Sequence, residues 1–165
     1  GCFSGAGFGG CAQPVSAVFH QHIYTVVFSG TLTNQLQLRR NLIRCGAVFK
    51  TVCDAEVALY AYIIYGADCA AELCGSFSLC VYDEYRERLF LARDRSGSKP
   101  LFYTFSESTL LFSSEVKTLL AAPSIKRRVS SIETKSIENI FWDIFEVKAG
   151  SCGFFDESGL CLNKY

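Results

Sequence analysis

The fold is indicated most clearly by residues 88–103, which read RLFLARDRSGSKPLFY. Two apolar runs, RLFLA and PLFY, flank a polar segment that holds two arginines, an aspartate, a lysine and several turn-forming residues. Aliphatic and aromatic residues favour strands, whereas Gly, Ser and Asp favour the turn between them. The segment is therefore predicted to form a strand, a loop and a second strand. Such a charged loop is either a salt-bridged turn or a functional feature.

Strand patterns continue on both sides of this segment. Apolar runs separated by short polar turns predict an antiparallel meander, in residues 77–82, 88–93, 100–105 and 109–114. An earlier run, IYTVVF at residues 23–28, predicts a buried strand that ends at Ser29 and Gly30. Near the end of the chain, GFFDESGLCL predicts one more hairpin.

A helix is predicted upstream of the meander, over residues 34–44. Thr33 is placed to act as its N-cap, and Gly46 follows its end. Leu36 and Ile43 are expected to belong to its apolar stripe. We therefore expect this helix to pack through the face that carries these two residues.

A second helix is predicted to begin at Cys53 or Asp54 and to end at Gly66. Apolar residues recur in it at helical spacing, at Val57, Tyr60, Ala61 and Ile64. A short helix over residues 115–121 is expected after the meander. Helices before and after a set of strands that are apolar on both faces predict an α+β or layered α/β fold, with the sheet covered by other layers.

The composition argues against several classes of protein. Half of the 165 residues are hydrophobic, which is enough for a sizeable core in one domain. Sixteen basic and sixteen acidic residues cancel, so no net field attracts nucleic acid or an anionic membrane. The longest uncharged apolar run, residues 57–67, is shorter than the roughly 20 residues of a membrane helix. We expect a soluble protein with a small or neutral ligand.

The cysteines and histidines do not predict a metal site. Nine cysteines lack any Cys-x-x-Cys pair, which argues against a zinc ribbon and a complete disulfide framework. Most of them are expected to be small core residues in a reducing compartment, the cytoplasm. His20 and His22 could share one face of a strand, but no third ligand is evident, so we expect them to have a surface role.

The RLFLARDRSGSKPLFY run resembles the glutaminase domain of asparagine synthetases, which are class II glutamine amidotransferases. The family's run has the form LARDR-x-G-x-KPLYY, and Ser96 and Ser98 occupy its variable places. The resemblance continues in order, because YTVVFSGTLTN is similar to VFNGEIYN, CDAEVALYAYIIYG to SDTEVLLHAYEEWG, and LLFSSEVKTLLAAPSIKR to LLFASELKALLAHPEIKP. It covers residues 10–165. It implies a class II amidotransferase domain over residues 1–165, as a fragment without the synthetase domain.

The resemblance implies an α+β fold, namely a four-layer αββα sandwich of the N-terminal-nucleophile amidohydrolase type with antiparallel sheets. We expect it to be incomplete at the N-terminal end, because the family's RGPD segment and HxRLSI strand are missing before residue 10. Beyond Tyr165 the family continues into a synthetase domain that uses ATP and Mg²⁺, so we expect no cofactor in this domain. The implied partners are glutamine and a synthetase domain, in cis or in trans, and a homodimer is left open.

The resemblance also implies the catalytic residues. Cys2 would be the nucleophile, with its own α-amine as the base, and attachment of Gly1 to that amine would block this role. Ser29 and Gly30 stand where the family has the asparagine side chain and the glycine N–H that bind the oxyanion. Gly30 is therefore expected both to support catalysis and to contact the substrate.

Two further positions are implied to bind the substrate. Asp54 matches the aspartate that holds the α-amino group of glutamine, although a helix N-cap is an equally good interpretation of this residue. Thr31 stands where the family has a glutamate that contacts the substrate. Glu56 is expected to support the first helical turn through the helix dipole.

Three functions remain open from the sequence. The first is a glutaminase that supplies ammonia for the ATP-dependent amidation of aspartate in a separate domain. The second is a catalytically inactive relative with a structural or regulatory role, which Ser29, Thr31 and the missing arginine favour. The third is a glutaminase that serves a sugar phosphate or phosphoribosyl acceptor, which the downstream match disfavours.

Overall fold

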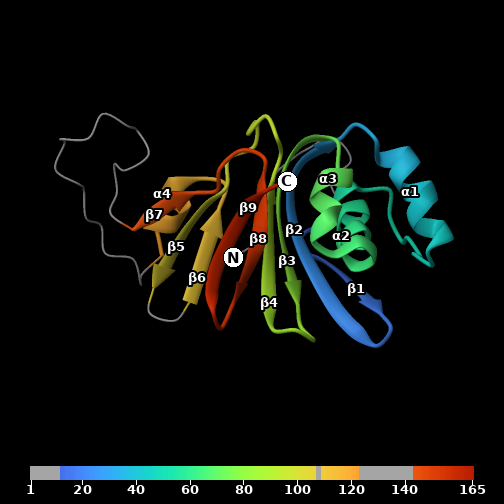
Figure 1. The fold of residues 1–165 in the computed structure, drawn as a ribbon, viewed down its shortest axis with the longest axis horizontal. Helices are drawn as coiled ribbons and strands as arrows, with labels where there is room; N and C mark the ends of the chain where they lie inside the picture. Colours follow the sequence, from blue (N-terminus) through green and yellow to red (C-terminus); the bar gives the residue numbers. More distant parts are fainter. Residues whose placement is uncertain (1–11, 107–108, 123–142) are drawn as a thin grey trace. The chain divides into compact units, whose positions relative to one another are not determined.

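The computed structural model describes residues 12–106, 109–122 and 143–165 and contains two compact units (Figure 1). Unit 1 consists of Gly1–Lys99 and Ala149–Tyr165, and unit 2 consists of Pro100–Lys148. Among the described residues, unit 1 holds a six-stranded sheet in the order β1-β2-β3-β4-β8-β9, and unit 2 a three-stranded sheet in the order β6-β5-β7. None of the helices in the described part of the chain is long and apolar enough to cross a membrane.

The elements of unit 1 are the strands β1 (Val15–Phe19), β2 (His22–Leu32), β3 (Gly75–Asp83), β4 (Arg88–Arg93), β8 (Ser151–Asp156) and β9 (Gly159–Lys164), with the helices α1 (Gln35–Arg44), α2 (Asp54–Tyr65), the 3-10 helix η1 (Gly66–Asp68) and α3 (Cys69–Glu72). Unit 2 contains β5 (Phe102–Ser106), β6 (Thr109–Ser113), α4 (Val116–Leu120) and β7 (Ile144–Glu146). The structure confirms the strands and helices predicted at β3 to β6, at α1, α2 and α4, and at the β8-β9 hairpin. The sequence did not predict β1, β7, η1 and α3.

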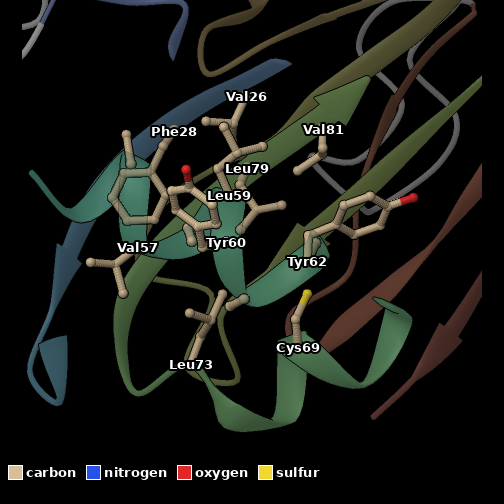
Figure 2. Close-up of a cluster of buried hydrophobic side chains, with 14 of the residues drawn as sticks. Val26, Phe28, Val57, Leu59, Tyr60, Tyr62, Cys69, Leu73, Leu79 and Val81 are labelled. Carbon is tan, nitrogen blue, oxygen red and sulfur yellow. The ribbon is translucent and has the colours of Figure 1, made fainter. Parts of the chain in front are cut away.

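Helix α2 lies at the centre of the core of unit 1. Its residues 55–62 are all buried, so the helix is covered on every side rather than along one stripe. Figure 2 shows it against side chains of the six-stranded sheet, which come from Val26 and Phe28 on β2 and from Leu79 and Val81 on β3. The register pairs Phe28 with Leu79 and Val26 with Val81, so these four side chains share one face.

Helix α1 buries a different face from the predicted one. Leu38 and Leu42 are 3% and 0% exposed, whereas Leu36 and Ile43 are 71% and 53% exposed. At 3.6 residues per turn the centres of the two pairs lie about 130° apart around the helix, so its sequence has two apolar stripes. The prediction chose the wrong stripe, because only contact with the core distinguishes them.

The predicted N-cap of α1 is also wrong. Asn34 precedes the helix, and it makes no side-chain capping bond. The Thr33 hydroxyl instead donates to the carbonyl oxygen of Cys74 at 3.2 Å, which ties the entry of α1 to the segment before β3. Gly46 follows the helix as predicted, with a positive φ of 95° and its N–H donating to the Ile43 carbonyl oxygen at 3.0 Å.

Strand β2 continues past its predicted end. It runs to Leu32 in a regular ladder with β3, in which Gly30 lies opposite Phe77. Gly30 has a φ of 138°, and a Cβ atom there would lie 2.0 Å from the Ser76 carbonyl oxygen. The glycine therefore permits a close approach of two strands rather than ending one of them.

The predicted meander is interrupted after β4. Strands β2, β3 and β4 are neighbours as expected, but β5 and β6 belong to the sheet of unit 2. The β8-β9 hairpin takes the place beside β4, with Leu91 opposite Gly153. Neighbouring strands in sequence often pair, but this preference is only statistical, and it fails at the loop after β4.

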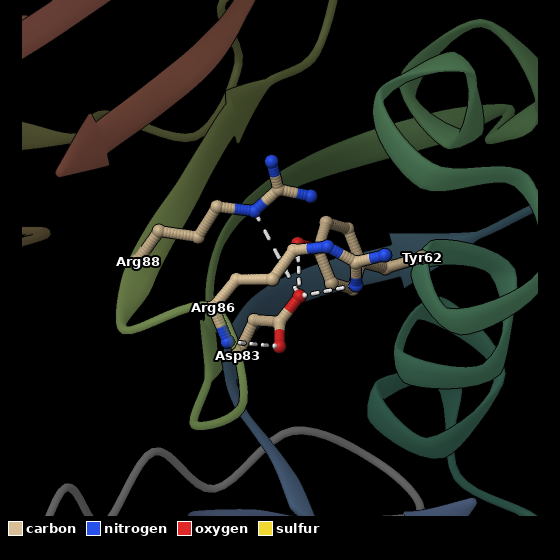
Figure 3. Close-up of polar contacts among 4 residues, drawn as sticks. All are labelled: Tyr62, Asp83, Arg86 and Arg88. Atoms are coloured by element: carbon tan, nitrogen blue, oxygen red, sulfur yellow. Dashed lines mark hydrogen bonds and ion pairs between the residues drawn. The ribbon is translucent and has the colours of Figure 1, made fainter. Parts of the chain in front are cut away.

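A buried carboxylate organises the turn between β3 and β4. Asp83 has no exposed surface, and Figure 3 shows its contacts with Tyr62, Arg86 and Arg88. The Tyr62 hydroxyl donates to it at 3.3 Å, the Arg86 guanidinium at 3.1 Å, and the Arg88 guanidinium lies 3.7 Å away. Burial, opposed by the charge of Arg88, raises the pKa of Tyr62 to about 12, so Tyr62 keeps its proton at neutral pH and donates a hydrogen bond to Asp83.

Candidate functional site

The loop that follows β4 is closed by hydrogen bonds of its own arginine. The Arg93 guanidinium donates to the carbonyl oxygens of Gly97 and Lys99, each at 2.8 Å. The carbonyl oxygen of Arg93 in turn accepts a hydrogen bond from the Tyr165 hydroxyl at 2.9 Å. Arg93 therefore links the loop to itself and to the end of the chain.

Asp94 binds the other side of the same loop. Its carboxylate accepts hydrogen bonds from the backbone N–H groups of Phe77, Ser98 and Lys99, each at 3.2 Å, and from the Ser96 hydroxyl. Burial alone would raise its pKa, but these hydrogen bonds together lower the pKa below its ordinary value. The run that marks the resemblance is thus a structural loop around a charged aspartate.

The predicted oxyanion donor lies on the edge of β2 that faces away from β3. The Phe28 N–H donates to Oε1 of Gln13 and the Phe28 carbonyl accepts from Nε2 of Gln13, both at 2.7 Å. The Leu32 N–H donates to Oδ2 of Asp54 at 3.0 Å. Because alternate residues of an antiparallel strand direct their backbone groups to the same side, Gly30 directs its N–H to this edge as well.

The backbone pairing on this edge ends before Gly30. Strand β1 pairs with β2 only as far as Val15 opposite Val26. Within residues 12–106, 109–122 and 143–165, no side chain or loop carbonyl accepts a hydrogen bond from the Gly30 N–H. Three alternate residues of β2 direct their backbone groups to this edge. Phe28 is bound by Gln13 and Leu32 by Asp54, whereas the N–H of Gly30 between them has no acceptor among the described residues. This geometry suits a donor to a negative oxygen.

Ser29 and Thr31 lie on either side of Gly30, and their side chains point to the other face of the sheet. Phe28 is buried toward α2, whereas Ser29 is half-buried and Thr31 exposed on the opposite face. Their register places them opposite Ser78 and Ser76 of β3. The structure therefore brings the three predicted residues onto one strand, and the role of the Ser29 hydroxyl as a second oxyanion donor stays a prediction.

Asp54 is the first residue of α2, so its interpretation as the helix N-cap is wrong. Cys53 precedes the helix in an extended conformation. The Asp54 carboxylate reaches back to the Leu32 N–H instead of bonding to its own helix. This contact places Asp54 at the same end of β2 as Gly30, and its role in binding the substrate stays a prediction.

Glu56 holds the loop before α2 through its carboxylate. Its buried carboxylate accepts hydrogen bonds from the N–H groups of Lys50 and Thr51 and from the Thr51 hydroxyl, each at 2.7 Å. Glu56 also lies in the first turn of α2, and its predicted interaction with the helix dipole stays a prediction. Because the loop leads directly into Asp54, these bonds also fix the start of α2.

The remaining residues considered in the sequence are Cys2, the histidines and the other cysteines. Cys2 lies outside the described residues. His20 has a positive φ of 48° in the turn before β2, and the described part of the chain holds no group of three or more metal-ligating side chains. Cys69 and Cys80 are free, and burial raises the pKa of both thiols. Cys53 is disulfide-bonded, whereas six cysteines of the described residues are free, so the prediction that the cysteines do not form a complete disulfide framework is confirmed.

Gln13 is the residue that the sequence did not identify. It belongs to the short run at residues 10–14 where the resemblance begins, but a glutamine before a proline carries no local signal of function. Its importance depends on a hydrogen-bonded partner 15 residues away, Phe28. Only the folded structure brings the two residues together.

Comparisons with known proteins identify the family of this chain. A family model described as "Glutamine amidotransferase domain" matches residues 8–165. Asparagine synthetase [glutamine-hydrolyzing] 3 of Bacillus subtilis is 37% identical over 94% of this chain and 27% of its own length. Putative asparagine synthetase [glutamine-hydrolyzing] 2 of Methanocaldococcus jannaschii is 32% identical over 70% of this chain and 22% of its own length. The chain thus spans about a quarter of these two relatives.

Solved structures show the same fold. Glutamine phosphoribosylpyrophosphate amidotransferase from B. subtilis superimposes with a TM-score of 0.69 at 18% identity, over 93% of this chain and 31% of that one. A glutamine aminotransferase class-II domain protein from Silicibacter pomeroyi gives 0.55 at 16% identity, over 86% of this chain and 67% of that one. They confirm the predicted α+β amidotransferase fold, and the family match favours the amidotransferase interpretation over the inactive module. The chain belongs to the glutamine amidotransferase domain family.

Proposed function

We propose that this chain hydrolyses glutamine to glutamate and ammonia. The observation that carries the proposal is the Gly30 N–H, which lies between the bonds of Phe28 with Gln13 and of Leu32 with Asp54. It lies on the edge of β2 that faces away from β3, which we call the open edge because no acceptor for this N–H lies among the described residues. A fixed backbone donor at a strand edge can stabilise the negative oxygen that develops when a nucleophile attacks an amide carbon.

The proposed reaction begins at Cys2. Its α-amine takes the thiol proton, and the thiolate attacks the side-chain amide carbon of glutamine, so the carbonyl oxygen becomes an oxyanion that the Gly30 N–H binds. The tetrahedral intermediate collapses, the amide nitrogen takes up a proton, and ammonia leaves. Water then attacks the thioester, which releases glutamate and restores the thiol. Glutamine and water are thus converted to glutamate and ammonia.

The other site residues are proposed to hold the substrate or to assist the oxyanion. Asp54 uses Oδ2 to bind the Leu32 N–H, so Oδ1 is the oxygen that would accept a hydrogen bond from the α-ammonium of glutamine. The Ser29 hydroxyl is the proposed second oxyanion donor, and Thr31 the proposed contact to the substrate. Loss of one oxyanion donor costs about 3 kcal/mol of barrier, so the shorter serine side chain would slow the reaction.

The proposed acceptor of the ammonia is aspartate in a separate synthetase domain, in cis or in trans, which uses ATP and Mg²⁺ while this domain uses no cofactor. The support is that the relatives at 37% and 32% identity carry the name glutamine-hydrolyzing asparagine synthetase. A cytoplasmic location is proposed from the six free cysteines of the described residues.

Glutamate release from glutamine tests the proposal. The chain is prepared in three forms: with Cys2 as the first residue, with Gly1 still attached, and with Cys2→Ala. We expect glutamate release in the first form alone, because only there is the α-amine of the cysteine free. Equal release in all three forms would contradict the role of Cys2, and no release in the first form would favour the inactive module that Ser29 and Thr31 suggest.

A further inference from the structure

The side chain of Gln13 replaces a segment of β-strand beside the site. Strand β1 begins at Val15, which lies opposite Val26, so a continuation of β1 would place residue 13 opposite Phe28. The Gln13 carboxamide instead supplies one acceptor and one donor, and it binds both backbone groups of Phe28 at 2.7 Å. It makes the pair of bonds that a strand backbone would make there.

This substitution determines where the edge of β2 opens. A backbone strand that continued past Phe28 would bring carbonyl oxygens alongside the following residues and could cover the Gly30 N–H. The side chain of Gln13 binds both backbone groups of Phe28 and has no further backbone groups that could pair with the next residues of β2. Gln13 thus fixes the edge of β2 at Phe28, two residues before Gly30, and Asp54 fixes it at Leu32, two residues after Gly30.

We infer that Gln13 is a positioning residue for the Gly30 N–H, an inference that rests on the proposed glutaminase function. It touches neither the substrate nor the reacting atoms. Its carboxamide fixes the backbone at Phe28, and with it the direction in which the Gly30 N–H meets the oxyanion. Preorganised donors of this kind act mainly on the transition state, so Gln13 affects kcat more than KM.

A second contact between β1 and β2 provides a matched control. The hydroxyls of Ser16 and Thr25 lie 2.8 Å apart across the same two strands, in an exposed position. Ser16→Ala removes a side-chain bond between β1 and β2 without touching Phe28. If Gln13 merely attached β1 to the sheet, the two losses would have similar effects on the site.

The experiment compares Gln13→Ala, Gln13→Glu and Ser16→Ala in the form of the chain that starts at Cys2. We expect Gln13→Ala to lower kcat by about 10-fold or more, with KM for glutamine within about 3-fold, and Ser16→Ala to leave both unchanged. Gln13→Glu has an acceptor but no donor until its new carboxyl is protonated. Its kcat relative to that of the unmodified chain should therefore rise as the pH falls toward 5.

The NMR order parameter of the Gly30 N–H is measured in the same variants and does not depend on activity. We expect it to fall in Gln13→Ala and to stay at the unmodified value in Ser16→Ala. Unchanged kcat and an unchanged order parameter in folded Gln13→Ala would overturn the inference while the proposed function stands. If the unmodified chain releases no glutamate, the proposed function fails, and the order parameter alone decides whether Gln13 positions Gly30.

Discussion

At the scale of single residues, Gly30 has two separate tasks. Its N–H lies on the open edge of β2, and its lack of a side chain lets β2 approach β3. The second task follows from backbone geometry alone, because a φ of 138° is adopted readily only by glycine. The two tasks can be separated by measuring stability and catalysis independently.

Gly30→Ala is expected to destabilise the fold strongly. A Cβ atom at Gly30 would lie 2.0 Å from the Ser76 carbonyl oxygen, whereas one at Gly46, with a φ of 95°, would meet nothing within 4 Å. Backbone strain alone costs about 1–3 kcal/mol, so Gly46→Ala should fall in that range and Gly30→Ala well beyond it. Urea unfolding of both variants measures the difference, and equal losses would contradict the close approach of the strands.

Ser29→Asn is expected to raise glutaminase turnover. A carboxamide is longer than a hydroxyl, and the resemblance places an asparagine at this position. A recovered oxyanion donor is worth about 3 kcal/mol, so an increase in kcat of about 10-fold or more is expected. Ser16→Asn, a second exchange of a serine on the same pair of strands, is the control. No increase in Ser29→Asn would contradict the proposed second donor.

Asp94 is expected to make stability depend on pH in the acid range. Its folded pKa lies below the ordinary value, so its contribution is complete above the unfolded pKa of about 3.9 and is lost as the pH falls through the folded pKa. Asp94→Asn should therefore lower the free energy of unfolding at pH 7 and flatten its decline below about pH 4. Unfolding curves from pH 7 to pH 2 test this, with the exposed Glu157→Gln as control.

At the scale of elements, α1 shows why a correct helix can be predicted with a wrong face. Leu42 is fully buried and its neighbour Ile43 is 53% exposed. Leu42→Ala should cost about 2–5 kcal/mol of unfolding free energy, whereas Ile43→Ala should stay within about 0.5 kcal/mol. Thermal or urea unfolding of this pair measures the orientation of the helix directly. A larger loss of unfolding free energy in Ile43→Ala than in Leu42→Ala would contradict this orientation and support the face predicted from the sequence.

Local pattern was sufficient for most elements of the fold. The apolar alternation around residues 88–93 and the helical spacing from Val57 to Ile64 each have a local physical cause, and both elements are present. The strand order could not be predicted in this way, since the β8-β9 hairpin joins β4 from more than 50 residues away. The candidate site divides similarly: Gly30 and Asp54 were predicted from a motif, and their roles stay predictions, whereas the contact of Gln13 with Phe28 became visible only in the folded structure.

At the scale of the whole molecule, the thiol chemistry is restricted by burial. Cys69, Cys80 and Cys152 are buried and free, and burial raises the pKa of each thiol, so these three are poor nucleophiles at neutral pH. Cys45, Cys74 and Cys161 are free and exposed. None of these six is among the residues that the resemblance brings to the open edge of β2.

Covalent labelling tests the central claim most directly, namely that this chain is a working glutaminase whose nucleophile is Cys2. The form that starts at Cys2 is treated with a diazoketone analogue of glutamine, and the product is examined by intact mass and peptide mapping. The account predicts one adduct, on Cys2, that excess glutamine prevents and that Gly30→Ala, if folded, slows. A folded chain that acquires no adduct at Cys2, or that is labelled equally at Cys45, Cys74 and Cys161 in the presence of glutamine, would contradict it.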